Sequence, residues 1–210
     1  NRMALQGDLL AAHVLGIQNV LVTHSEDISQ SDHRDAKEVF DLDETELIQA
    51  VAALNKGKDL GGFELDGIPD FTMGCTTAPC ADEAALDQEI AAAAAKVDAG
   101  ASFLITPPVF DLDTFAAFMK KVQTLKVPVI PTVFLIKSLA IAQYIVNSEP
   151  GANIPDELIR RIRKSSDRER EGIKIAGETV AALKEMTNGV LLQTLGWEHR
   201  LPEILDIAGL

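Results

Sequence analysis

The sequence feature that most constrains the fold is residues 88–111, QEIAAAAAKVDAGASFLITPPVFD. The alanine run at 91–95 is the strongest helix former in the chain, and Gly100 stands where a left-handed helix stop is expected. The apolar residues 103–105 follow directly between turn residues, as in a strand buried on both faces of a parallel sheet. Asp111 then precedes a new amphipathic run. Helix, strand and helix in so short a segment indicate an α/β fold.

The same alternation of short apolar runs and amphipathic segments continues along the chain. Five strands are expected, at residues 20–23, 71–75, 102–106, 128–132 and 190–194. Asp43 is expected to cap a helix over residues 44–55, with Glu46 completing a capping box. Repeated βα units predict a parallel sheet, which forms either a (β/α)8 barrel or an open doubly wound sheet.

The number of strands favours a barrel that is incomplete in this chain. A complete barrel takes ~250 residues, whereas the chain has 210. A dinucleotide-binding sheet is disfavoured, because no G-x-G-x-x-G follows any expected strand. We therefore expect residues 1–210 to form a single α/β domain, a (β/α)8 TIM barrel lacking its N-terminal strands.

Composition and charge exclude several kinds of partner. The formal net charge of −13 argues against a nucleic acid, although a few local cations could still hold a phosphorylated cofactor. The sequence contains no membrane-spanning apolar run and no recognisable signal peptide.

Cys75 and Cys80 give no disulfide framework and indicate the reducing cytoplasm. They lack a second pair or nearby histidines, so no metal site is expected. Because the chain opens on Asn1 rather than Met, we expect a fragment or a processed product.

Ligands of α/β proteins bind at the carboxyl ends of the parallel strands. Small hydroxyl side chains recur at these ends, and they suit an uncharged or phosphate-bearing ligand; they are Thr23, Thr76, Thr77, Thr106, Thr132 and Thr194. The alternative explanation is that threonine is simply favoured in strands.

Charged residues give two further candidates. Glu26 and Asp27 follow the first strand directly, so one of them is the best candidate for an acid or base. For His24 beside them, a polar residue of a solvated loop is the favoured explanation. Lys96 is an isolated cation on an alanine face, either a lysine that reaches solvent or a contact for a cofactor lying close to the helix.

Four segments together resemble the methylenetetrahydrofolate reductase family, whose fold is a flavin-binding (β/α)8 barrel. These segments are NRMALQGDLLAAHVLGIQNVLV at the start, FDLD at 40–43, KVDAGASFLITPPVFD at 96–111 and TLGWEHR at 194–200. The resemblance runs over nearly the whole chain in the same order. It implies FAD-dependent reduction of a methylene-folate to a methyl-folate, with NAD(P)H or another donor reducing the flavin. FMN in place of FAD is left open.

The resemblance also implies roles for individual residues. The loop formed by Thr23, His24, Ser25 and Glu26 would lie along the flavin ring. Glu26, or Asp27, would replace the family's aspartate between flavin and folate, which makes Glu26 the catalytic candidate. The remaining cofactor contacts would come from Phe40 and Asp41 near the ribityl and phosphate groups, Thr76 and Cys80 over the adenosine and phosphates, and Glu89 and Lys96 at the ribose and pyrophosphate.

The chain also departs from the family pattern at the positions that would meet the folate substrate. Thr106 is followed by Pro107 where the family commonly has a glutamine, and Trp197 stands where the family has an arginine. The family's early strands, which carry a catalytic glutamate, have no counterpart here.

These observations support three hypotheses. The first is a flavin-dependent methylenetetrahydrofolate reductase-like enzyme. The second is a non-catalytic barrel subunit or scaffold of a one-carbon enzyme complex. The third is a different (β/α) enzyme, such as an aldolase that forms a Schiff base on Lys96. Bare strand edges of an incomplete barrel further predict a homo-oligomer or a partner subunit.

Overall fold

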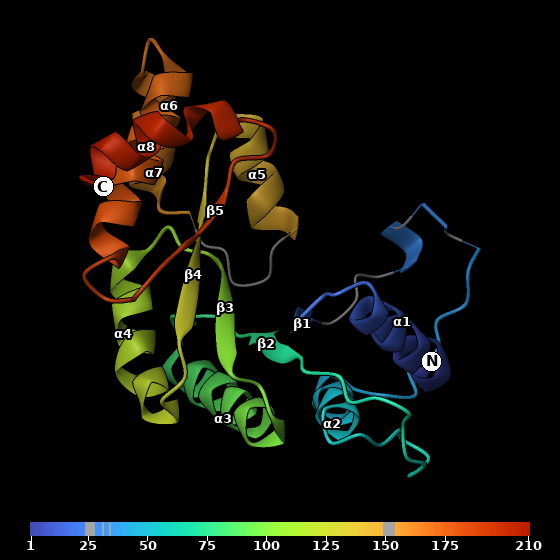
Figure 1. Ribbon diagram of the computed structural model, residues 1–210. Coiled ribbons are helices and arrows are strands. Elements are labelled where there is room, and N and C mark those ends of the chain that lie inside the picture. Colours follow the sequence, from blue (N-terminus) through green and yellow to red (C-terminus); the bar gives the residue numbers. More distant parts are fainter. Residues whose placement is uncertain (24–27, 31, 34, 149–153) are drawn as a thin grey trace. The chain divides into compact units, whose positions relative to one another are not determined.

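The computed structural model (Figure 1) describes residues 1–23, 28–30, 32–33, 35–148 and 154–210. The chain divides into two compact units. The first unit comprises Asn1–Thr76 and Ala92–Phe103, and the second comprises Thr77–Ala91 and Leu104–Leu210. Helices and parallel strands occur in both units, which confirms the predicted α/β class. The closed (β/α)8 barrel and the single domain remain predictions.

The first unit contains a pair of parallel strands with helices before and after β1. Its elements are α1 (Arg2–Val14), β1 (Asn19–Val22), η1 (Ile28–Gln30), α2 (Glu44–Leu54) and β2 (Thr72–Thr76). β1 and β2 pair in parallel, from Asn19 opposite Thr72 to Val22 opposite Cys75. The apolar face of α2 supplies much of the core through Ile48, Val51 and Leu54.

The second unit is built on three parallel strands paired in chain order (Figure 1). Its strands are β3 (Phe103–Pro108, of which Phe103 belongs to the first unit), β4 (Val129–Phe134) and β5 (Leu191–Gln193). Its helices are α4 (Leu112–Val122), η2 (Gln123–Leu125), α5 (Leu139–Ser148), α6 (Asp156–Lys164), α7 (Arg168–Leu183), η3 (Glu198–Arg200) and α8 (Leu201–Ala208). The remaining helix, α3 (Glu83–Ala99), has residues in both units.

The helix α7 forms the packing centre of the second unit. It buries Ile173, Val180 and Leu183, among others, and it packs against β4, α6 and α8. Its Gly172 lies so close to the strand end that an added Cβ would stand 2.1 Å from the carbonyl oxygen of Ile136. A hydrogen atom is therefore the only side chain that this contact admits.

The expected helix signals occur where the sequence places them. Asp43 and Glu46 form the complete capping box of α2. The carboxylate of Asp111 accepts hydrogen bonds from the backbone N–H groups of Asp113 and Thr114 at the start of α4. Gly100 follows α3 with φ +130°, a conformation that favours glycine.

The first and last strands are partly exposed to solvent. In β1, Asn19 and Leu21 are exposed, and β5 is exposed at Leu191 and Gln193. Among the described residues, each of these strands pairs on one side only, and α1 contains no buried residue that could cover an apolar face. Apolar strand residues are therefore left partly open to solvent. No helix in the described part of the chain is long and apolar enough to cross a membrane.

Candidate functional site

The first unit carries an open pocket of about 760 Å³ beside the carboxyl end of β1. It is lined by Asn1, Leu5, Thr23, Val39, Phe40, Asp41, Leu42, Asp43, Glu44, Thr45 and Leu47. Three residues singled out from the sequence, Thr23, Phe40 and Asp41, therefore meet on one surface although the chain separates them. Phe40 is 70% exposed, so its ring face is available to a ligand.

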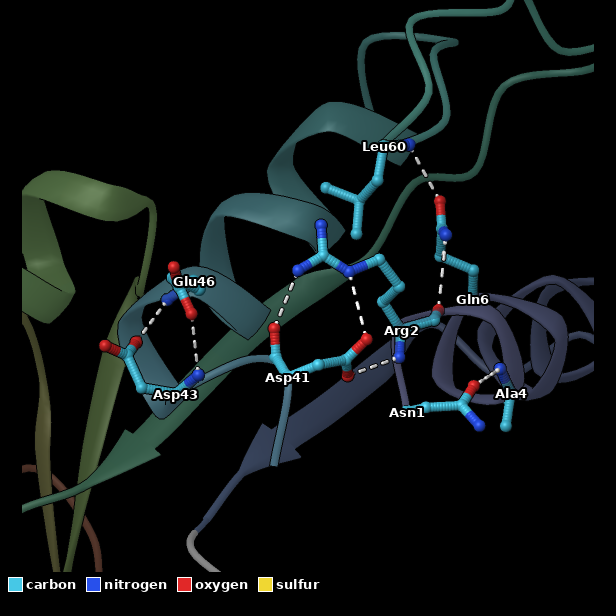
Figure 2. Close-up of polar contacts among 8 residues, drawn as sticks. All are labelled: Asn1, Arg2, Ala4, Gln6, Asp41, Asp43, Glu46 and Leu60. Atoms are coloured by element: carbon cyan, nitrogen blue, oxygen red, sulfur yellow. Dashed lines mark hydrogen bonds and ion pairs between the residues drawn. The ribbon is translucent and has the colours of Figure 1, made fainter. Parts of the chain in front are cut away.

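The carboxylate of Asp41 is fixed by the first helix (Figure 2). The backbone N–H of Arg2 donates to Oδ1 over 2.8 Å, and the guanidinium Nε donates to Oδ2 over 3.1 Å. Arg2 Nη2 also donates to the carbonyl oxygen of Asp41 over 2.8 Å. Burial alone would raise the pKa of Asp41, but the hydrogen bonds and charge of Arg2 outweigh it and lower that pKa. Asp41 is thus an ionised carboxylate that is paired with the Arg2 guanidinium.

The amino end of α2 lines the same pocket through Asp43, Glu44 and Thr45. Figure 2 shows the capping box at this helix end. Asp43 Oδ1 accepts from the backbone N–H of Glu46 over 2.7 Å, and Glu46 Oε2 accepts from the backbone N–H of Asp43 over 2.9 Å. The two side chains satisfy two N–H groups that a helix start leaves open. Along the chain, Phe40 and Asp41 precede this cap and Glu44 follows it.

Lys96 differs from the sequence prediction of an isolated cation. Its Nζ lies 2.6 Å from Oε2 of Glu44 and donates to the carbonyl oxygen of Thr76 over 3.1 Å. The Lys96 side chain is only 12% exposed and that of Glu44 20%. Lys96 does reach the carboxyl end of β2, as expected, but as half of a largely buried ion pair. Its Nζ is engaged rather than open to a carbonyl substrate, which weakens the aldolase hypothesis.

In the second unit, Glu89 and Cys80 lie around the loop that follows β2. Glu89 Oε1 accepts from the backbone N–H of Ala78 over 2.9 Å, so Glu89 holds this loop against α3. The Cys80 thiol donates to the carbonyl oxygen of Ala78 over 3.5 Å. Burial, and then the charges of Glu89 and Asp82, raise the pKa of Cys80. A thiol of raised pKa is a poor nucleophile and a poor metal ligand at neutral pH.

Most of the threonines at the strand ends belong to the second unit. Thr106, Thr132 and Thr194 are buried. The Thr132 hydroxyl donates to the carbonyl oxygen of Thr106, and the Thr106 hydroxyl donates to the carbonyl oxygen of Pro107. Thr194 donates to Glu198 over 2.9 Å. Thr77 is also buried, and its hydroxyl has no hydrogen-bond partner among the described residues. Thr76 and Thr23 lie in the first unit.

Trp197 belongs to a cluster that follows β4 and β5 in the second unit. The Lys137 ammonium lies 4.7 Å from the centre of the Trp197 ring and also donates to the carbonyl oxygen of Leu195. Leu195 has φ +46°, a left-handed conformation uncommon outside glycine. Glu198 accepts from the Thr194 hydroxyl and the backbone N–H of Gly196. The backbone N–H of Glu198 itself, and then the bonds from Thr194 and Gly196, lower the pKa of Glu198, with a smaller effect from the Lys137 charge.

The catalytic candidate Glu26 lies outside the described residues, as do His24, Ser25 and Asp27. Sequence reasoning missed Arg2, Glu44 and Lys137, because each acts on a partner far away in the chain. The one local signal was the place of Glu44 at the first position of α2, directly after the Asp43 cap. Within the part of the chain that the structure describes, no group of three or more His, Cys, Asp or Glu side chains could hold a metal ion.

Comparison with known families decides the family of this chain. The family model described as Methylenetetrahydrofolate reductase matches residues 1–209. The chain belongs to the methylenetetrahydrofolate reductase family. The match covers both units, so it includes the pocket of the first unit and the Trp197 cluster of the second.

Other comparisons define how far this relation extends. No match was found among curated proteins. One similar solved structure is described as an uncharacterised protein from Clostridium thermocellum that binds two copies of 5-methyl-5,6,7,8-tetrahydrofolic acid. The similarity has a TM-score of 0.52 at 15% sequence identity and covers 66% of this chain. It covers 53% of that protein, so this chain spans about half of its length. At this identity the similarity shows a shared fold.

The described side chains that line the pocket of this reductase-family chain offer no free cation to the diphosphate of FAD. The described residues that line it include three carboxylates, Asp41, Asp43 and Glu44, and no lysine, arginine or histidine. The nearby cations, Arg2 and Lys96, are held by Asp41 and Glu44. A diphosphate binds where free cations or backbone N–H groups face it. The lining instead offers acceptor oxygens and an exposed aromatic ring.

Proposed function

We propose that this chain binds a reduced folate in the pocket of the first unit and acts in the one-carbon metabolism of its family. The reaction of the complete protein would be reduction of a methylene-folate to a methyl-folate in the cytoplasm. A flavin would supply the hydride, and NAD(P)H would reduce the flavin. The observation that carries the proposal is the meeting of Thr23, Phe40 and Asp41 around one pocket of suitable size.

The chemistry of the lining supports a folate ring system. A pterin is a flat ring with several N–H donors, and carboxylate oxygens accept such hydrogen bonds. Asp41 and Asp43 retain acceptor capacity beyond their present partners, and the exposed ring of Phe40 offers a face for stacking. The volume of about 760 Å³ lies within the roughly 300–1,000 Å³ of small-molecule pockets. The proposal assigns the flavin no position in this pocket, because the described residues do not fit its diphosphate.

A second candidate is a folate-binding chain without reductase activity, serving as a subunit of a one-carbon enzyme complex. The carboxylate lining favours it, since the described lining side chains offer no cation to the diphosphate of FAD. Pro107 favours it too, because proline replaces the family's glutamine at the end of β3. Turnover of NADH and methylene-folate by the purified protein distinguishes the two candidates.

The proposed binding is tested by calorimetric titration with 5-methyltetrahydrofolate. Phe40→Ala removes the stacking face and should weaken binding about tenfold. Phe63→Ala is the matched control, because Phe63 is 73% exposed in the same unit and does not line the pocket. Equal affinities of the wild-type protein and Phe40→Ala would refute this placement. An absorbance spectrum of the same protein reports any bound flavin.

A further inference from the structure

Glu44 has two roles in the first unit. It lines the large pocket, and its Oε2 lies 2.6 Å from the Lys96 ammonium. Because Glu44 is the first residue of α2, directly after the Asp43 cap, its backbone is fixed by the capping box. The Thr76 carbonyl holds Lys96 from the other side. The Glu44–Lys96 ion pair is therefore a fixed feature of one pocket wall.

The charges around the pocket make this pair important for ligand choice. The Arg2 guanidinium forms an ion pair with the Asp41 carboxylate, with Nε 3.1 Å from Oδ2. The Lys96 ammonium forms an ion pair with the Glu44 carboxylate. A phosphate entering the pocket would approach three carboxylates, and the described lining residues include no lysine, arginine or histidine side chain. It could gain Lys96 only by displacing Glu44, whose carboxylate would then lie beside the phosphate as a like charge.

We propose that Glu44 is a specificity-determining residue: by holding Lys96, it makes the first-unit pocket select uncharged or N–H-donating rings and reject phosphate-bearing ligands. The inference deepens the proposed function, because it explains how one pocket would distinguish a pterin ring from a flavin nucleotide. Glu44 acts through Lys96 and is in this sense a positioning residue. Once Glu44 is neutral, the Lys96 ammonium becomes a free anion-binding group at the carboxyl end of β2.

Riboflavin and FMN are suitable probes, because they share one ring system and differ by a single phosphate. Their binding to the full chain is followed by quenching of flavin fluorescence. In the wild-type protein, riboflavin should bind at least as tightly as FMN. Glu44→Gln should raise the affinity for FMN about tenfold, as expected for one freed charge-assisted contact, and leave riboflavin unchanged. Added salt should weaken only the FMN gain.

Two further variants separate the proposed role from a general change of charge. Glu64→Gln removes one negative charge from an exposed position of the same unit, outside the pocket lining, and should leave the FMN-to-riboflavin ratio unchanged. Adding Lys96→Met to Glu44→Gln should abolish the FMN gain. Melting temperatures and far-UV circular dichroism of all variants verify folding. If Glu44→Gln does not fold, Glu44→Asp, which shortens the side chain, should give a smaller gain in the same direction.

The proposal is overturned if wild-type protein prefers FMN, or if Glu44→Gln leaves the FMN-to-riboflavin ratio unchanged. It is also overturned if the FMN gain survives removal of Lys96. Gain of FMN binding by Glu44→Gln supports it even where wild-type protein binds neither flavin. A parallel titration with 5-methyltetrahydrofolate identifies which idea has failed. Folate binding with an unchanged ratio refutes the role of Glu44 alone, whereas absence of folate binding refutes the proposed function.

Discussion

The carboxylate of Asp111 caps the start of α4. Its Oδ1 accepts from the backbone N–H groups of Asp113 and Thr114, and its Oδ2 accepts from the Thr114 hydroxyl over 2.8 Å. Burial alone would raise the pKa of Asp111, but the hydrogen bonds from Thr114 and Asp113 outweigh it and lower that pKa. The ionised form is therefore the one that stabilises the start of α4.

Asp111→Ala should lower the free energy of unfolding by about 1 kcal/mol at pH 7, the usual loss for an N-cap. Because the folded pKa lies below the unfolded value of about 3.9, the ionised carboxylate contributes fully above about pH 4. Its contribution is lost as the pH falls through the lowered folded pKa. Urea denaturation at several pH values measures this difference. Asp113→Asn removes a charge from the same turn but keeps the cap, so a loss of equal size there would contradict the assignment.

The residues of the candidate site differ in how far the sequence alone can predict them. The capping box of Asp43 and Glu46 was predictable, because both partners lie within one helical turn. The pairing of Lys96 with Glu44 was not, because it joins residues that are distant in the chain and depends on how α2 and α3 lie beside β2. Lys96 was for this reason wrongly predicted to be an isolated cation, although its reach toward the strand end was correct.

At the level of elements, close approach of α7 to the end of β4 depends on one glycine. A methyl group at Gly172 would stand 2.1 Å from the backbone oxygen of Ile136, and backbone cannot rotate away as a side chain can. Gly172→Ala should therefore lower the free energy of unfolding by about 3 kcal/mol. Chemical denaturation provides the measurement.

Gly7→Ala is the matched control for this substitution. Gly7 lies in α1, and nothing stands within 4 Å of an added Cβ. Alanine is a better helix former than glycine by roughly 0.5–1 kcal/mol, so Gly7→Ala should stabilise the chain. If the two variants had the same effect, steric contact between α7 and β4 could not be the cause.

The strands show where local pattern stops being informative. All five strands fall where the apolar runs place them, because a short apolar run between turn residues is a local signal. The burial of β1 cannot be predicted from its apolar run, because burial of a strand depends on a neighbouring strand on each side. Among the described residues β1 has one such neighbour, β2, which leaves Leu21 43% exposed.

At the level of the whole molecule, the exposed apolar residues of the first unit predict association. Large apolar side chains open to solvent include Met3, Val14, Leu15, Ile17, Leu21, Phe63 and Ile68. An unpaired strand edge next to exposed apolar surface is a site for pairing with another chain. We expect light scattering to detect a dimer or a larger species. Leu21→Lys should favour the monomer, and a wild-type protein that stays monomeric at every concentration would contradict the prediction.

Folate binding in the pocket of the first unit is the property on which the proposed function depends most. Hydrogen–deuterium exchange with and without 5-methyltetrahydrofolate tests this claim most directly. The ligand should slow amide exchange in residues 39–47, which form most of the pocket wall, because bound ligand stabilises the backbone that it contacts. Protection that is strongest in this segment would support the account. Folate binding without any change in residues 39–47 would contradict it.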